Sequence, residues 1–145
     1  MIALIQRVTS ARVDVAGETI GSIGAGMLAL IGVQREDGEC NVERMVERLL
    51  GYRIFQDAED RMNLSLRDVC GGLLLVPQFT LAADTRKGTR AGFSTAAPPE
   101  RAQQLFLALV ALARSRHPVV ETGRFGAEMS VALVNHGPVT FWLDA

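Results

Sequence analysis

The sequence is poor in cysteine and histidine, with two of each among its 145 residues. Cys40 and Cys70 lack the clustered spacing of a zinc site or a redox pair, so we expect two free thiols. No two histidines stand four residues apart around a glutamate, and no glycine loop ends in Lys-Ser or Lys-Thr. These absences exclude the common zinc-protease and nucleotide-binding signatures.

Long apolar stretches are also absent. The longest, Leu105–Ala113, falls far short of the roughly 20 residues that cross a bilayer. The first residues place no basic segment ahead of an apolar one, unlike a secretory signal. We therefore expect a cytoplasmic protein with no membrane partner.

Neither sign of charge is in excess, since 15 Lys and Arg oppose 16 Asp and Glu, and the formal net charge is −1. Nucleic-acid-binding domains are commonly strongly basic, so this balance argues against that class, and DNA is not an expected partner. A hydrophobic content of 48% with so little net charge also disfavours disorder. The length suits one domain with a sizeable core, over residues 1–145.

Apolar runs with short turns between them dominate the first third of the chain and predict strands that pair as an antiparallel meander. A later run, Leu73–Val76, is continuously apolar and should be buried on both faces. The segments that we expect to be strands are Ile2–Val8, Val13–Val15, Thr19–Ile23, Met27–Val33, Tyr52–Phe55, Leu73–Val76, Val119–Thr122, Met129–Val134 and Val139–Leu143.

Two segments instead carry apolar residues at helical spacing. The first, Glu39–Leu50, alternates apolar and charged faces and is followed by Gly51, a typical helix terminator. The second begins at Pro98–Glu100, with proline and an acid in its first turn, and runs to Arg116. Together with the strands, these helices predict a strand-rich α/β domain.

Two further segments carry unusual residues. Val134–Thr140, with the sequence VNHGPVT, joins two predicted strands, and its Asn, Gly and Pro predict a tight hairpin turn with an exposed His136. In Val76–Phe93 a buried strand runs into Gln78, Phe79 and Thr80. The basic loop that follows carries Arg86, Lys87 and Arg90. These cations favour a phosphate-bearing ligand, and the alternative is a solvated charged loop.

These segments resemble the D-aminoacyl-tRNA deacylases of the bacterial type, and the resemblance covers the whole chain. Its signature motifs are QFTL at residues 78–81 and the NxGPVT form at residues 135–140. The segments MIALIQRV (1–8), GYRIF (51–55) and TGRFGA (122–127) match as well. The resemblance implies an editing hydrolase that cleaves the ester of D-aminoacyl-tRNA, and of glycine mischarged on tRNA(Ala), without a metal or cofactor.

The resemblance also implies an architecture for the site. Family members have mixed, mostly antiparallel sheets in a barrel-like core with two main helices outside, and they form homodimers. Gly137-Pro138, in the cis form, would reach into the partner's pocket and reject L side chains with backbone carbonyl oxygens. Arg7 and Asn135 would support this motif, and Ala102 would keep the pocket wall small.

For the chemical step, the resemblance points to the QFTL motif. Backbone N–H groups of Phe79 and Thr80 would stabilise the oxyanion, and Gln78 would orient the ester or the adenosine. No base stands beside the Thr80 hydroxyl in the sequence, so we expect the 2′-hydroxyl of the tRNA to assist instead. Pro77 stands where the family usually has serine, which excludes a backbone donor at that position.

Two other functional hypotheses remain open on the sequence alone. The first is a domain that binds RNA or a small molecule without turnover, with Pro77 as a mark of its divergence. The second is a small-ester or peptide hydrolase that ignores RNA and uses Thr80 as its nucleophile. In the leading hypothesis, Arg86, Lys87 and Arg90 hold the tRNA at its acceptor end. A few phosphate contacts are then enough for binding.

Overall fold

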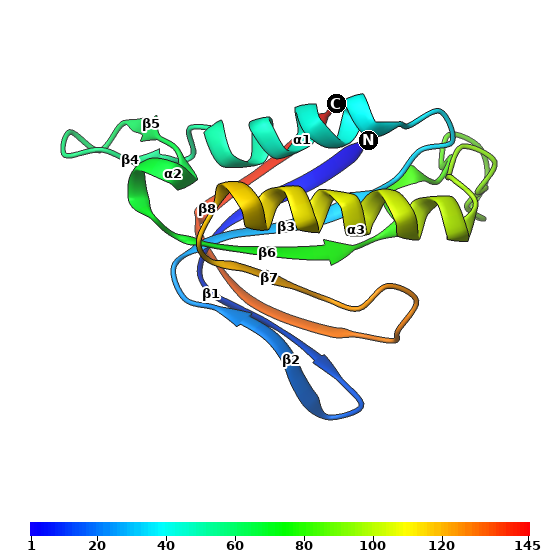
Figure 1. The fold of residues 1–145 in the computed structure, drawn as a ribbon, viewed down its shortest axis with the longest axis horizontal. Helices are drawn as coiled ribbons and strands as arrows, with labels where there is room; N and C mark the ends of the chain where they lie inside the picture. Colours follow the sequence, from blue (N-terminus) through cyan, green and yellow to red (C-terminus); the bar gives the residue numbers. More distant parts are fainter.

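The computed structural model describes residues 1–145 and shows a curved sheet with two long helices on one face (Figure 1). In chain order the elements are β1 (Ile2–Val15), β2 (Glu18–Ile23), β3 (Gly26–Gly32), α1 (Glu39–Gly51), β4 (Phe55–Gln56), β5 (Met62–Leu64), α2 (Leu66–Val69), β6 (Gly72–Pro77), the 3₁₀ helix η1 (Phe79–Ala82), α3 (Pro99–Arg116), β7 (Val120–Thr122) and β8 (Ser130–Asp144). No helix is long and apolar enough to span a membrane.

Strand β1 organises the sheet, because β8 pairs along nearly its whole length on one edge while β3 and β2 share the other edge. The predicted meander is therefore wrong: β2 and β3 do not pair with each other. They follow one another along β1, with Ile23 opposite Ala11 and Gly26 opposite Val8. Gly24 and Ala25 form a bend between β2 and β3, the two consecutive partners of this long strand.

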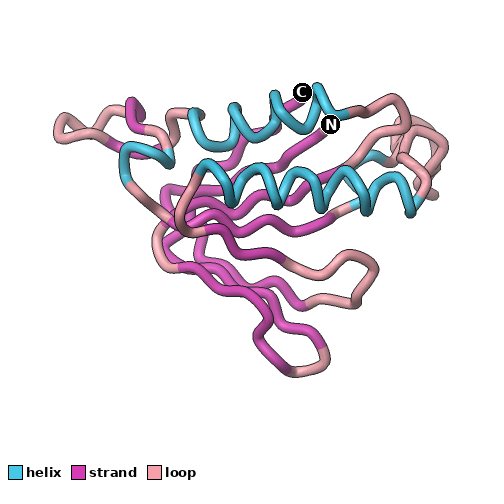
Figure 2. The backbone as a smooth tube through the Cα atoms, viewed as in Figure 1, coloured by secondary structure: helices cyan, strands magenta, loops and turns pink.

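The sheet continues from β3 through β6 to β7 in parallel pairs, in the order β2-β1-β3-β6-β7. Its two ends then approach each other. A side chain at Gly21 of β2 would lie only 2.9 Å from the carbonyl oxygen of Thr122 in β7. The strands curl under the helices (Figure 2) into a nearly closed, barrel-like sheet, and this part of the fold prediction is confirmed.

Strand β6 is buried on both faces, as its sequence predicts. Leu73 and Leu75 belong to a cluster of 25 buried residues that includes the inner faces of α1 and α3. Leu74 and Val76 point the other way, into a cluster of seven buried residues shared with β1 and β3. The alternation follows from the two-residue period of a strand, and it places the end of β6 inside the molecule.

The predicted hairpin at Val134–Thr140 is wrong. Strand β8 runs straight through this segment, and the residues between Asn135 and Thr140 bulge out of the ladder. On β1, Gln6 pairs with Thr140 and Val8 with Asn135, so four residues of β8 stand opposite one of β1. Asn135, Gly137 and Pro138 form a bulge instead of a turn because β1, the neighbouring strand, continues past them.

Other differences are small. The strand predicted at Tyr52–Phe55 is shorter and shifted, since only Phe55 and Gln56 form β4. Strand β5 and the one-turn helix α2 were not predicted, since elements of three or four residues are too short to show a period. The segment FTLA forms the helix η1 at the end of β6. Cys40 and Cys70 are free and exposed, as expected.

Gly26 and Gly72 begin β3 and β6 side by side, and their backbones leave no room for a side chain at Gly26. Gly26→Ala should lower the free energy of unfolding by about 1–3 kcal/mol, because the methyl group overlaps the Gly72 backbone. Gly24→Ala is the matched control, since nothing lies within 4 Å of a side chain there. Urea unfolding of both variants tests this, and equal effects would contradict it.

Candidate active site

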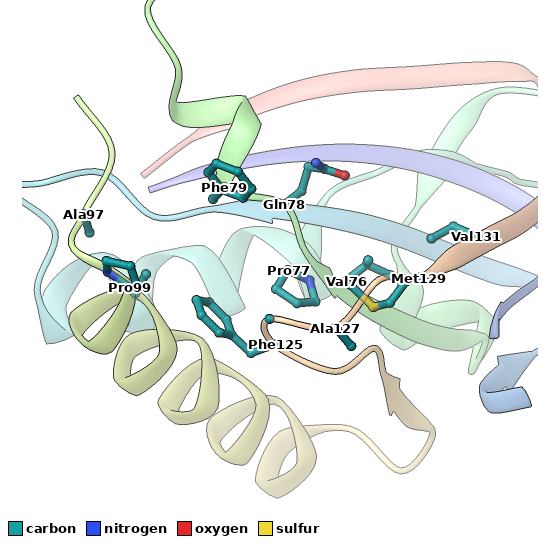
Figure 3. A pocket seen from close by; sticks show the side chains of 12 residues that line it. Val76, Pro77, Gln78, Phe79, Ala97, Pro99, Phe125, Ala127, Met129 and Val131 are labelled. Atoms are coloured by element: carbon teal, nitrogen blue, oxygen red, sulfur yellow. The ribbon is translucent and has the colours of Figure 1, made fainter. Parts of the chain in front are cut away.

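A cavity of about 450 Å³ opens between the end of β6, the start of α3 and the segment before β8 (Figure 3). Most of its wall is apolar, and Gln78 is the polar side chain among its lining residues. It is lined by Val76, Pro77, Gln78, Phe79, Ala97, Pro99, Ala102, Phe125, Gly126, Ala127, Met129 and Val131. Such a cavity suits a small organic group with few polar contacts.

Pro77 explains why the cavity opens at this place. The last hydrogen bond between β6 and the β7 strand runs from the Gly123 N–H to the Leu75 carbonyl, at 2.9 Å. Two residues further on, Pro77 has no N–H to continue the ladder. The chain after Gly123 therefore separates from β6, and Figure 3 shows Pro77, Phe125 and Met129 around the gap.

Two of the residues after Pro77 have backbone N–H groups without an acceptor. The Gln78 N–H still pairs with the Ile31 carbonyl at 2.7 Å, after which the chain turns into η1. The N–H groups of Phe79 and Thr80 occupy the first turn of this helix and donate to no backbone or side-chain acceptor. Two adjacent free donors can stabilise one negatively charged oxygen.

The side chain of Thr80 is placed differently from its neighbours. Gln78, Phe79 and Ala102 line the cavity, whereas Thr80 lines an adjoining groove with Asp84 and Arg86. Its hydroxyl accepts a hydrogen bond from the Gln78 side-chain amide. No carboxylate or imidazole forms a hydrogen bond with this hydroxyl, so nothing there removes its proton.

Arg7 holds the bulge in β8. The residue is only 7% exposed, and its Nε donates to the His136 carbonyl at 3.1 Å. Its Nη1 donates to the Ile54 carbonyl at 2.8 Å. The guanidinium thus ties the segment that precedes β4 to the bulge.

Asn135 closes the same bulge from the other side. Its Oδ1 accepts from the Val139 N–H at 3.1 Å, and its Nδ2 donates to the Thr140 hydroxyl at 2.9 Å. Within the bulge the Gly137-Pro138 peptide bond is cis and Gly137 has φ +129°. His136, Gly137 and Pro138 are exposed.

The bulge and the cavity are not brought together within one chain. Arg7 stands opposite Met27, which pairs with Leu73 at the start of β6. Gln78 follows the end of β6, and the four steps along the strand from Leu73 to Pro77 span about 13 Å at the usual strand rise. Gly137 and Pro138 are absent from the residues that line the cavity.

The basic loop contributes two free cations. Arg86 is bound by Asp84 through Nε at 2.9 Å and Nη2 at 2.8 Å, and these bonds hold the pKa of the Asp84 carboxyl well below its ordinary value. Lys87 and Arg90 are exposed and form no ion pair. With Arg86 they line a shallow hollow of about 470 Å³.

The comparison with protein families matches residues 4–144 to the family described as D-Tyr-tRNA(Tyr) deacylase. The chain belongs to this family. The family expected from the motifs is thereby confirmed, and with it the enzyme class of a deacylase. A D-aminoacyl-tRNA deacylase of Azotobacter vinelandii is 63% identical over the full length of both chains. One from Thioalkalivibrio sulfidiphilus is 65% identical, with 99% of this chain and 97% of the relative covered.

Solved structures agree with the family's fold. A c-Myc DNA unwinding element binding protein superposes with a TM-score of 0.96 at 36% identity, and 100% of this chain and 99% of the other are covered. A probable eukaryotic D-amino acid tRNA deacylase superposes with a TM-score of 0.87 over 99% of this chain and 98% of the other. At 18% identity the latter supports the fold alone.

Among the residues that line the cavity, sequence reasoning missed those of the apolar walls. Phe125, Met129 and Val131 line the cavity together with Pro77. Phe125 stands in the TGRFGA segment that carries the resemblance, but apolar residues in a loop give no sign of which cavity they line. Their role follows from the separation of this loop from β6.

Arg7→Met keeps the length and apolar stem of the side chain but removes its donors. We expect the free energy of unfolding to fall by about 1–3 kcal/mol, because the buried Ile54 carbonyl loses its partner. Arg12→Met is the control on the same strand, since Arg12 is 59% exposed in an ion pair with Asp14 and should change stability by less than about 0.5 kcal/mol. Denaturant unfolding of both variants measures the difference, and similar losses would refute the role of Arg7.

Proposed function

We propose that this chain is an aminoacyl-tRNA editing hydrolase that cleaves the ester of D-aminoacyl-tRNA and of glycyl-tRNA(Ala). The products are the free amino acid and the tRNA, so the protein works where tRNA is charged, in the cytoplasm. Membership of the deacylase family supports the activity. The observation that carries the mechanism is the pair of free N–H groups at Phe79 and Thr80, beside an apolar cavity.

In this mechanism water attacks the ester carbonyl carbon, and negative charge develops on the carbonyl oxygen. The Phe79 and Thr80 N–H groups stabilise that oxygen, a role worth about 3–4 kcal/mol for one donor in other hydrolases. The bond to the tRNA 3′-oxygen then breaks, and this oxygen takes up a proton. Gln78, whose amide also binds the Thr80 hydroxyl, orients the ester or the adenosine at the cavity mouth.

The proton transfers are assigned to the substrate. The hydroxyl of Thr80 has Gln78 as its hydrogen-bond partner and no base within reach, so it is a poor nucleophile at neutral pH. The 2′-hydroxyl of the terminal adenosine is next to the ester bond in any aminoacyl-tRNA. As the water attacks, the 2′-hydroxyl can accept the proton that the water loses and pass its own proton to the leaving 3′-oxygen, so that the hydroxyl is restored.

The rejection of L-amino acids is assigned to a second copy of the chain. In a homodimer, the exposed Gly137 and Pro138 of each subunit reach the partner's cavity, which they do not line within their own chain. Backbone carbonyl oxygens there exclude an L side chain, while a D side chain points away and glycine has none. Exposed Val134 and Trp142 on β8 supply apolar surface for the contact.

The tRNA is held by the basic loop. Lys87 and Arg90 are free to bind phosphates, and Arg86 shares its charge with Asp84. So few contacts give weak binding with a shallow dependence on salt, about 0.7–0.9 in the log-log slope for each phosphate neutralised. Weak binding suits an enzyme that must release tRNA after each cleavage.

Purified protein should release D-tyrosine from D-tyrosyl-tRNA and leave L-tyrosyl-tRNA almost untouched. Radiolabelled esters measure both rates, and Thr80→Val, which keeps the shape and the backbone N–H, should retain most of the activity. Equal rates on both esters would refute the chiral selection. Binding of tRNA without hydrolysis would favour a non-enzymatic domain, and equal rates on free D-amino-acid esters would favour a small-ester hydrolase.

Mixed dimers test whether the bulge acts across the interface. A side chain at Gly137 would lie 2.7 Å from Val139 Cγ2 and 3.0 Å from Arg7 Nη2, so Gly137→Ala should displace the bulge and weaken selection. Gln78→Ala should inactivate the cavity of its own chain. A dimer with one chain of each kind keeps one intact Gln78 cavity facing one intact bulge.

We therefore expect the mixed dimer to discriminate between D and L esters as the unaltered protein does, at about half its activity. The dimer with Gly137→Ala in both chains should hydrolyse the L ester as well. If the bulge acted within its own chain, the mixed dimer would also lose discrimination, because its only active cavity would carry Gly137→Ala.

A further inference from the structure

Two phenylalanines lie side by side on the surface outside the cavity. Phe79 is 58% exposed and Phe93 is 46% exposed, and their ring centroids are 5.2 Å apart. Phe79 stands at the cavity mouth, whereas Phe93 is not among the lining residues. Aromatic rings are usually buried, so an exposed pair beside a substrate cavity indicates a binding site for a ligand with an aromatic face.

The backbone on both sides of Phe93 is fixed. Gly92 and Asp84 exchange two hydrogen bonds, at 2.7 Å and 2.9 Å. The Ala96 N–H donates to the Phe93 carbonyl at 3.2 Å, and the Arg35 N–H donates to the Thr95 carbonyl at 3.0 Å. The ring is therefore presented from an ordered turn, which reduces the entropy lost when it binds a partner.

Positive charge adjoins the pair. Lys87 and Arg90 have no carboxylate partner, and the hollow that they line includes Gly92 and Ser94, the two neighbours of Phe93 in the chain. Exposed aromatic rings beside unpaired cations are the combination that binds single-stranded nucleic acid, because bases stack on the rings while phosphates meet the cations. A paired duplex has no free base face to offer.

We propose that Phe93, packed on Phe79, is the stacking site for an unpaired base of the RNA, that of the nucleotide directly before the terminal adenosine. This inference rests on the proposed function, which places the ester in the cavity. An RNA strand that leaves the cavity over Phe79 meets Phe93 next and then Lys87 and Arg90. The protein thus recognises the single-stranded 3′ end as well as the terminal adenosine.

The test uses D-tyrosyl esters of adenosine, of the dinucleotide CA and of the trinucleotide CCA. For the unaltered protein, kcat/KM should rise about 5- to 20-fold when the first nucleotide is added, in line with the usual gain from stacking one base. Phe93→Ala should remove this rise through KM and leave kcat and the rate on the adenosine ester unchanged. Phe93→Trp should restore it, and Phe93→Leu should not.

Leu107→Ala is the matched control, since it removes an exposed apolar side chain from α3 and should leave all three rates unaltered. The inference is overturned if the rise persists in Phe93→Ala, if the unaltered protein hydrolyses the three esters without such a rise, or if Phe93→Ala slows the adenosine ester equally. The last result would assign Phe93 to the structure of the cavity.

Binding of uncharged CCA separates this inference from the proposed function. Fluorescence titration should show weaker binding to Phe93→Ala than to the unaltered protein and to Leu107→Ala. If the unaltered protein hydrolyses none of the three esters, the proposed function fails, while a loss of CCA binding in Phe93→Ala still supports the stacking site. Equal CCA binding by all three proteins overturns it.

Discussion

A buried positive charge on β1 determines how the strands around it are arranged. The Arg7 guanidinium has no carboxylate partner and is satisfied by the carbonyls of Ile54 and His136. A charge taken out of water is costly unless it is hydrogen-bonded, so both carbonyls must stay in place. β8 must therefore depart from its ladder with β1 at this point, and the segment before β4 must lie against β1. One side chain thus couples three parts of the chain.

The bulge shows where prediction from sequence fails. Asn135, Gly137 and Pro138 are turn residues, and locally they predict a hairpin. The choice between a hairpin and a bulge depends on whether one unbroken strand lies alongside, which β1 provides and which no local pattern reveals. The importance of Arg7 came from the family resemblance. An arginine within an apolar strand gives no sign of the carbonyls that it will meet.

The elements with strong periods were predictable. Both long helices begin and end within a residue or two of their signals, and the continuously apolar β6 is buried on both faces. The pairing of the strands could not be predicted. Strands β2 and β3 pair with successive parts of the same edge of β1, which is possible only because β1 is long. For the site, the polar residues came from motifs. The apolar walls could not be predicted, because they form where Pro77 has no N–H to continue the hydrogen bonds between β6 and the chain after Gly123.

The charge balance of the chain takes on a different meaning at the site. A net charge of −1 gives no long-range attraction for a polyanion, so RNA has to be recognised by contacts close to the cavity. Asp84 reduces these further by binding Arg86, but the same ion pair and the Asp84–Gly92 backbone bonds order the turn that carries Phe93. The loop thus has one free cation fewer, because Arg86 is paired, but the turn that carries Phe93 is ordered. With Lys87 and Arg90 as the unpaired cations of the loop, stacking on aromatic rings becomes the contact that distinguishes a single-stranded RNA end from any other anion.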